Sequence, residues 1–137
     1  MGKEFKTISH TDDLGIVVYG KNLKELFESA AFGMFSLIAK PVKYSKMKFM
    51  SVTVTANNTE DLLIAYLNEL QHYYSVRKIL LRSSKIMFLS ENKVSAKITG
   101  EEISKHVILN DIKSARYHDL KIVKTRAGYK TEIIFEV

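Results

Sequence analysis

The chain has 137 residues, the size of a single domain with its own hydrophobic core, and it contains no cysteine. The lack of cysteine excludes disulfides, thiol catalysis and thiolate-bound zinc or iron–sulfur sites, and it fits a reducing compartment. With 21 lysines and arginines against 15 aspartates and glutamates, the net charge is +6. Such a charge favours an anionic partner, such as RNA or an acidic protein surface, or reflects only the solubility of a small basic domain.

Targeting segments are not apparent in the sequence. No apolar run reaches the roughly 18 residues of a membrane-spanning helix, and the first residues lack the apolar segment of a signal peptide. We therefore expect a soluble cytoplasmic protein that forms one domain over residues 1–137.

Two short strands joined by an acidic turn are predicted at the N-terminal end. In residues 4–9, Phe5, Thr7 and Ser9 alternate with Lys6 and Ile8, and the β-branched run 16–19 lies between two glycines. The segment between the strands, residues 9–16, therefore presents two carboxylates and an imidazole in a turn.

An amphipathic helix is predicted to follow. Asn22 with Glu25 three residues later has the form of a helix start, and apolar residues then recur at helical spacing as far as Ile38. Pro41 restricts the residue before it, so the helix should end near Lys40.

A second helix is predicted to begin with Thr59 as its cap, because two acidic residues occupy the first turn. Its apolar face includes Tyr66, Tyr73 and Tyr74. These rings could stack on RNA bases, but aromatic residues at helical spacing are more typical of a core. We expect both helices to cover a sheet rather than to bind a partner or a membrane.

The remaining segments read mainly as strands. In residues 46–56 the apolar positions change parity near Phe49, which predicts a bulged strand. Residues 86–89 and 94–98 form a predicted hairpin with its turn at 90–93, and two further strands are expected at 120–124 and 129–135. Two helices and six to eight strands indicate an α+β domain, with the helices packed on a mixed or antiparallel sheet.

Carboxylates near both ends of the chain are the candidate metal ligands. Asp12, Asp13, Glu136 and the carboxylate of Val137 offer hard oxygen atoms, which suit calcium, magnesium or manganese rather than zinc. Adjacent aspartates in a turn also commonly cap backbone N–H groups, and neighbouring side chains diverge, so we expect one ligand from the pair. His10 is expected to hold the turn through a backbone hydrogen bond rather than act as a base.

Several catalytic constellations are missing. The four histidines are dispersed, no serine lies in a nucleophile elbow, and the glycines fit neither common phosphate-binding loop. Nucleotide hydrolysis by this chain is therefore not expected. Lys113 could contact a phosphate or be a solvated lysine at a strand edge.

Taken together, the ordered motifs of this chain resemble the archease family. The segment 10–16 looks like the family signature H-T-A-D-[IVL]-G-I. The later matching blocks are Tyr19-Gly20-Lys21, Glu25-Leu26-Phe27, Asp61-Leu62-Leu63, Leu67-Asn68-Glu69-Leu70, Ile112-Lys113-Ser114-Ala115, Tyr117-His118-Asp119-Leu120 and Phe135-Glu136-Val137.

The resemblance implies a strand-helix-strand-strand module with a divalent metal, calcium foremost and otherwise magnesium or manganese, bound by Asp13, Glu136 and Val137. Asp12 and His10 would support this site. The family implies a protein that is not itself an enzyme but activates a GTP-dependent RNA ligase in tRNA splicing or RNA repair. It would promote guanylylation and repeated turnover of the ligase, which uses the GTP and brings the RNA.

Departures from the family pattern affect the expected site. Glu136 stands where aspartate is common and adds one methylene, and Asp12 replaces a small residue. Arg116 stands where threonine is frequent. Lys113, Arg116 and His118 are the expected contacts with ligase or RNA.

Two other functions are compatible with parts of this sequence. One is a basic RNA-binding module without a role in ligase activation, in which Lys113, Arg116 and Arg126 contact phosphates and binding weakens steeply with salt. The other is a metal-dependent hydrolase, for which the sequence offers no identifiable water-activating base.

Overall fold

The computed structural model describes residues 4–10, 13–40, 47–102, 107–116 and 120–137. Its elements in chain order are β1 (Glu4–His10), β2 (Asp13–Gly20), α1 (Leu23–Ile38), β3 (Ala39–Lys40), β4 (Met47–Thr55), α2 (Thr59–Ser75), β5 (Ile79–Leu89), β6 (Lys93–Glu102), β7 (Val107–Ile108), β8 (Ser114–Ala115), β9 (Val123–Thr125) and β10 (Gly128–Glu136).

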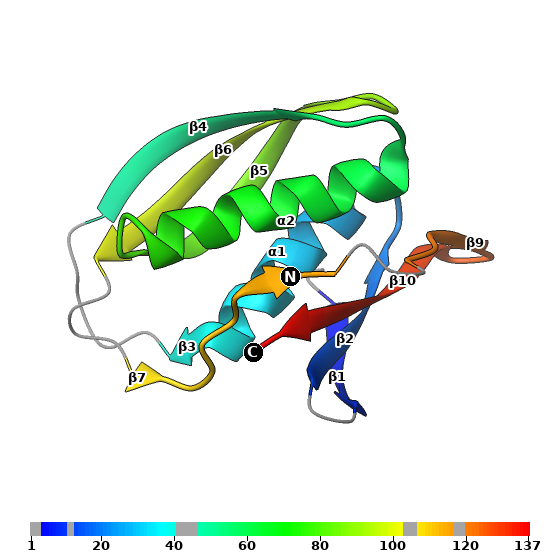
Figure 1. Ribbon diagram of the computed structural model, residues 1–137. Helices are drawn as coiled ribbons and strands as arrows, with labels where there is room; N and C mark the ends of the chain where they lie inside the picture. The colour runs from blue at the N-terminus through cyan, green and yellow to red at the C-terminus, as the bar shows by residue number, and fades with distance from the viewer. Residues whose placement is uncertain (1–3, 11–12, 41–46, 103–106, 117–119) are drawn as a thin grey trace.

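The elements form three layers, with the helices between two sheets (Figure 1). One sheet has the strand order β1-β2-β10-β8, with β9 also paired to β10, and the other has the order β4-β6-β5. A small third pair joins β3 and β7. Every described pairing is antiparallel, which confirms the predicted α+β class with two helices packed on antiparallel sheets. Neither helix is both long and apolar enough for a membrane crossing within the described residues.

The predicted start of α1 is confirmed. The Asn22 side-chain oxygen accepts a hydrogen bond from the Glu25 N–H at 2.9 Å, and the Glu25 carboxylate accepts one from the Lys21 N–H at 3.0 Å. The first bond satisfies one of the N–H groups that a helix N-terminus otherwise leaves without a partner, and the second ties the residue before the cap to the first turn. The helix ends at Ile38, where the backbone becomes extended at Ala39.

The cap of α2 was predicted one residue too late. Asn58, rather than Thr59, has the extended backbone of a cap, and its side-chain oxygen accepts from the Asp61 N–H at 2.8 Å. Both residue types cap helices, and asparagine is the stronger of the two. The sequence therefore could not distinguish two adjacent candidates by residue type alone.

The bulge predicted near Phe49 was wrong. Strand β4 pairs with β6 without interruption from Met47 opposite Glu101 to Thr55 opposite Lys93. The irregular positions lie instead in β5, between Leu81 and Ser83 and between Ile86 and Phe88. The prediction assumed that every apolar residue faces the core, but Phe49 lies on the outer face and is 79% exposed.

Short strands explain the remaining differences. The described residues form ten strands rather than six to eight, because β3, β7 and β8 have two residues each and leave no alternating pattern. Strand β2 begins at Asp13, so this residue belongs to a strand and not to the predicted turn. The hairpin between β5 and β6 is confirmed, with the Ser90 N–H donating to the Lys93 carbonyl at 2.9 Å.

A buried tyrosine lies in the core between the layers. Tyr66 is fully buried, its ring centroid is 5.9 Å from that of Phe27, and its hydroxyl has no hydrogen-bond partner among the described residues. Burial raises the pKa of Tyr66 above its usual range, and the negative charge of the Glu28 carboxylate reinforces this effect.

We expect the fold to lose stability at alkaline pH through Tyr66. Above about pH 10 a tyrosine in the unfolded chain ionises while the buried one keeps its proton, so the free energy of unfolding falls as pH rises. Urea denaturation at neutral and alkaline pH should show this loss, and Y66F should reduce it. At neutral pH the variant should differ by less than about 1 kcal/mol. An equal alkaline loss in both proteins would contradict this role.

Candidate metal centre

The strand register brings opposite ends of the described chain together. Strand β2 lies between β1 and β10, with His10 opposite Asp13 on one side and Phe135 opposite Leu14 on the other. Continuing the second register by one residue places the Asp13 backbone beside Glu136, where antiparallel Cα atoms are typically about 5 Å apart. The backbones of two predicted ligands are therefore neighbours although 122 residues separate them.

The structure describes some of the other predicted site residues only in part, and some not at all. Asp12 and His118 lie outside the described residues, and only the backbone is described at His10 and Asp13. Among the side chains that the structure describes, no group of three or more His, Cys, Asp and Glu residues is arranged to hold a metal ion. The ligand set of Asp13, Glu136 and Val137 therefore stays a prediction.

Glu136 is an accessible carboxylate at the end of β10, with its side chain 53% exposed. The Ser114 hydroxyl donates to Oε1 at 3.1 Å, and the Arg116 guanidinium lies 3.9 Å from Oε2. Surface ion pairs of this kind contribute little stability, so the carboxylate remains available to a stronger cation. Lys113 is also exposed, and its N–H donates to the Glu136 carbonyl at 2.8 Å. The structure thus brings Lys113 and Arg116 next to the predicted acid.

Helix α2 holds the segment that supports Glu136. The Asn68 side-chain oxygen accepts from the Ala115 N–H at 2.7 Å, and its amide donates to the Ala115 carbonyl at 3.2 Å. Asn68 therefore bonds both polar groups of this residue as a further strand would. The Gln71 amide donates to the Ile112 carbonyl at 2.8 Å, and the Tyr74 hydroxyl lies 3.1 Å from the Asp111 carboxylate.

Sequence reasoning missed Asn68 and Gln71. Their signal was a pair of amides three residues apart, which places them on one side of a helix otherwise rich in buried apolar residues. Amides in such surroundings need hydrogen-bond partners. This pattern identifies the two residues as supports for a buried backbone segment. It does not show which segment of the chain they bind.

Two isoleucines cover the outer face of the sheet near Glu136. A Cβ atom on Gly15 would lie 2.7 Å from Ile8 Cγ1 and 3.0 Å from Ile134 Cδ1, so both side chains pack directly over this glycine. Along β10, Ile134 and Glu136 share a face because residues two apart point to the same side. The acid therefore borders a small apolar surface that requires glycine at position 15.

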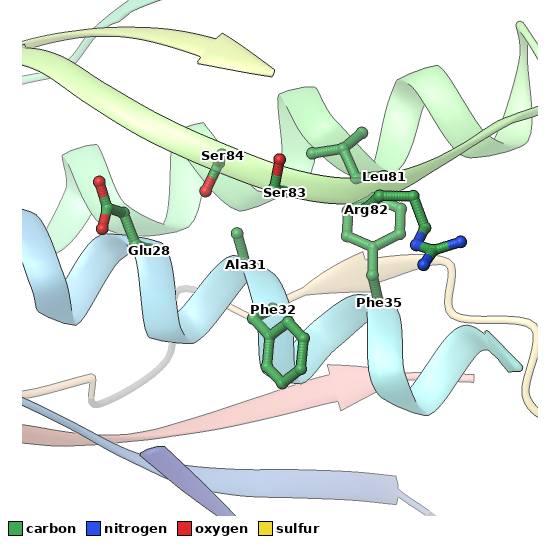
Figure 2. A pocket seen from close by; sticks show the side chains of 8 residues that line it. All are labelled: Glu28, Ala31, Phe32, Phe35, Leu81, Arg82, Ser83 and Ser84. Atoms are coloured by element: carbon green, nitrogen blue, oxygen red, sulfur yellow. The ribbon is translucent and has the colours of Figure 1, made fainter. Parts of the chain in front are cut away.

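A groove between α1 and β5 is not a ligand site of useful size. Side chains from the two elements face one another across it (Figure 2), and its volume is about 40 Å³. Pockets for organic ligands are typically about 300 Å³ or larger, so this space suits a few water molecules. The Glu28 carboxylate, which also lines the groove, accepts a hydrogen bond from the Ile86 N–H at 2.9 Å.

The donor chemistry at the ends of β2 and β10 fits a hard divalent cation. The side-chain oxygens of an aspartate and a glutamate are ligands that calcium, magnesium and manganese prefer. Because the two residues lie on paired strands, the ligands would be held by rigid elements rather than by loops.

Comparison with known proteins gives consistent matches. The model of the Archease protein family (MTH1598/TM1083) matches residues 5–137. Protein archease of Methanosarcina acetivorans is 30% identical over 142 aligned residues, covering 99% of this chain and 97% of the relative. Protein archease of Pyrococcus abyssi is 31% identical, covering 92% of each chain.

Two solved structures share the fold. The solution structure of Methanobacterium thermoautotrophicum protein 1598 has a TM-score of 0.75 and 25% identity, covering 98% of this chain and 99% of the other. The crystal structure of a Thermotoga maritima archease, described as a possible chaperone, has a TM-score of 0.71 and 22% identity over 96% of each chain. With the family model matching almost the whole sequence, the chain belongs to the Archease protein family.

Proposed function

We propose that this protein is an accessory factor, not itself an enzyme, that activates a GTP-dependent RNA ligase in the cytoplasm. It would promote guanylylation of the ligase and so allow repeated rounds of tRNA splicing or RNA repair. GTP is bound and used by the ligase, and RNA reaches the complex with that partner. Membership of the archease family supports the accessory role.

The observation that carries the proposal is the register of β2 and β10, which brings Asp13 and Glu136 to one edge of the sheet. We propose Asp13, Glu136 and the carboxylate of Val137 as ligands of a divalent metal, calcium foremost and otherwise magnesium or manganese, with Asp12 and His10 in support. A bound cation would supply positive charge at the surface presented to the ligase.

The chain's own residues would position this surface. Ile8 and Ile134 provide apolar contact area over Gly15 beside the acid, Arg116 provides a cationic group next to it, and the Lys113 backbone holds the end of β10. Guanylyl transfer depends mainly on positioning and on charge neutralisation, which a rigid strand edge can assist from outside the ligase. Arg116 already contacts Glu136, which favours a role in orienting the acid over RNA binding.

The test is a comparison of ligase turnover with and without this protein. The cognate ligase is assayed with excess RNA ends and GTP, and separately in a single-turnover format with ligase that already carries the guanylyl group. We expect stimulation of multiple turnover and little effect on the preloaded round. Equal multiple-turnover rates with and without the protein would refute the proposed activation.

A further inference from the structure

The outer face of the sheet β4-β6-β5 carries exposed aromatic and cationic side chains that neither the fold nor the metal site uses. In register, this face presents one row with Phe49, Thr99 and Ser83, a second with Ser51, Lys97 and Lys85, and a third with Thr53, Ser95 and Phe88. The opposite side of the same strands packs on the helices, where Val52, Ala96 and Ile86 are buried. We call these nine outward residues the β4-β6-β5 outer face.

Two phenylalanines on this face are open to solvent. Phe49 on β4 is 79% exposed and Phe88 on β5 is 50% exposed, with Met87 beside it at 47%. Phe49 and Phe88 lie on the two strands that flank β6, two rows apart. From ordinary strand spacings they are about 16 Å apart across the sheet. Exposed rings on a flat sheet offer the π-faces on which unpaired bases stack.

The middle row has an uncompensated positive charge. Lys85 and Lys97 are directly paired across β5 and β6, an arrangement that destabilises a sheet when nothing neutralises it. No ion pair of either lysine is found among the described residues, whereas nearby Arg82 and Lys48 contact Glu101 and Glu102. The two free lysines therefore lie between the two exposed rings, where a polyanion crossing the sheet would neutralise them.

Hydroxyl groups complete this surface. The Thr53 and Ser95 oxygens are 3.1 Å apart, and Ser51 and Thr99 lie in the neighbouring rows. Such groups form hydrogen bonds with phosphates, sugars and base edges. An acidic peptide would match the lysines but would leave the rings unused, and a double helix keeps its bases stacked away from them.

We propose that the β4-β6-β5 outer face binds single-stranded RNA, with bases stacked on Phe49 and Phe88 and the intervening phosphates near Lys85 and Lys97. This surface lies across the helix layer from β2 and β10 (Figure 1), so it is separate from the candidate metal centre. It also differs from the RNA contacts expected at Lys113, Arg116 and Arg126. The proposal does not depend on ligase activation.

The test measures RNA binding by the protein alone. Fluorescence anisotropy is followed with labelled single-stranded oligouridylate and oligoadenylate of about 12 nucleotides, with a duplex of the same length, and with polyglutamate, each over a range of salt. We expect the single strands to bind more tightly than the duplex or polyglutamate. F49L and F88L, which keep apolar bulk but remove the ring, should each weaken binding by roughly 5- to 50-fold.

Charge variants provide the second arm. K85Q combined with K97Q should weaken binding and make the plot of log affinity against log salt less steep by about 1.4, because two phosphate contacts to a single strand are lost. K24Q combined with K124Q, two exposed lysines on α1 and β9, removes the same charge elsewhere and should have a smaller effect. Equal losses in the two double variants, unchanged binding by F49L and F88L, or preference for polyglutamate would each overturn the proposal.

Discussion

Replacing Asp13 with asparagine is expected to abolish most of the stimulation of ligase turnover while leaving the fold intact. The amide keeps the size of the side chain but removes the negative charge that a divalent cation requires. Substituting a residue that only supports a metal ligand typically lowers metal affinity or activity by about 10- to 100-fold. We expect at least that loss when a direct ligand is replaced. E136Q should behave alike if both residues hold one ion.

Metal titrations and a control variant separate loss of a metal ligand from a general loss of negative charge. Calorimetric titration with calcium, magnesium and manganese should show weakened binding to D13N and E136Q without any ligase present. E132Q is the matched control, because Glu132 is exposed and lies on the same strand and face, four residues before Glu136. It should retain metal binding and turnover. Normal metal affinity in D13N would disprove the assigned ligand.

Extending the chain beyond Val137 tests the third proposed ligand. A short appended peptide converts the terminal carboxylate of residue 137 into an amide, which removes its charge. We expect weaker metal binding and weaker stimulation, while the unfolding transition stays unchanged because Val137 is 45% exposed. Full activity of the extended protein would remove this carboxylate from the site and leave the two acidic side chains.

Replacing Asn68 with leucine is expected to lower the free energy of unfolding by about 2–4 kcal/mol. The substitution leaves the N–H and the carbonyl of Ala115 without the partners that now lie at 2.7 and 3.2 Å. Ala115 is only 2% exposed, so water cannot replace both bonds. Each buried backbone group left without a partner costs roughly 1–3 kcal/mol, and the apolar gain of leucine offsets only part of this.

Urea denaturation of matched variants would measure this effect. N68D keeps an acceptor for the Ala115 N–H but loses the donor to its carbonyl, so its stability should fall between those of N68L and the parent protein. E69Q changes the exposed neighbouring residue on α2 and should have little effect. Parental stability in N68L would show that the paired hydrogen bonds contribute nothing.

The same variant should also affect the candidate metal centre. Ser114 and Lys113 reach Glu136 from the segment that Asn68 anchors, through bonds of 3.1 and 2.8 Å. Loosening this segment would allow the end of β10 to move, so N68L should bind the metal more weakly even under conditions where it remains folded. A folded variant with unchanged metal affinity would separate the anchoring role from the site.

Local chemistry was sufficient to predict most of the regular elements. The cap at Asn22, both amphipathic helices and the hairpin at residues 90–93 depend on interactions within a few residues. Ordered motifs likewise identified the family, since the blocks span the chain and need no contacts to be recognised. The cap of α2 was misplaced because two adjacent residues could make the same bond.

Long-range pairing decided what local patterns could not. Whether Phe49 faces the core or solvent depends on which face of the β4-β6-β5 sheet the helices cover, and alternation along one strand carries no such information. Likewise, only the register of β2 with β10 places Asp13 beside Glu136, and only the packing of α2 brings Asn68 to Ala115. By itself the sequence determined the helices, most strands and the family; the tertiary structure decided which faces meet, because strand order and register are set by contacts between distant residues.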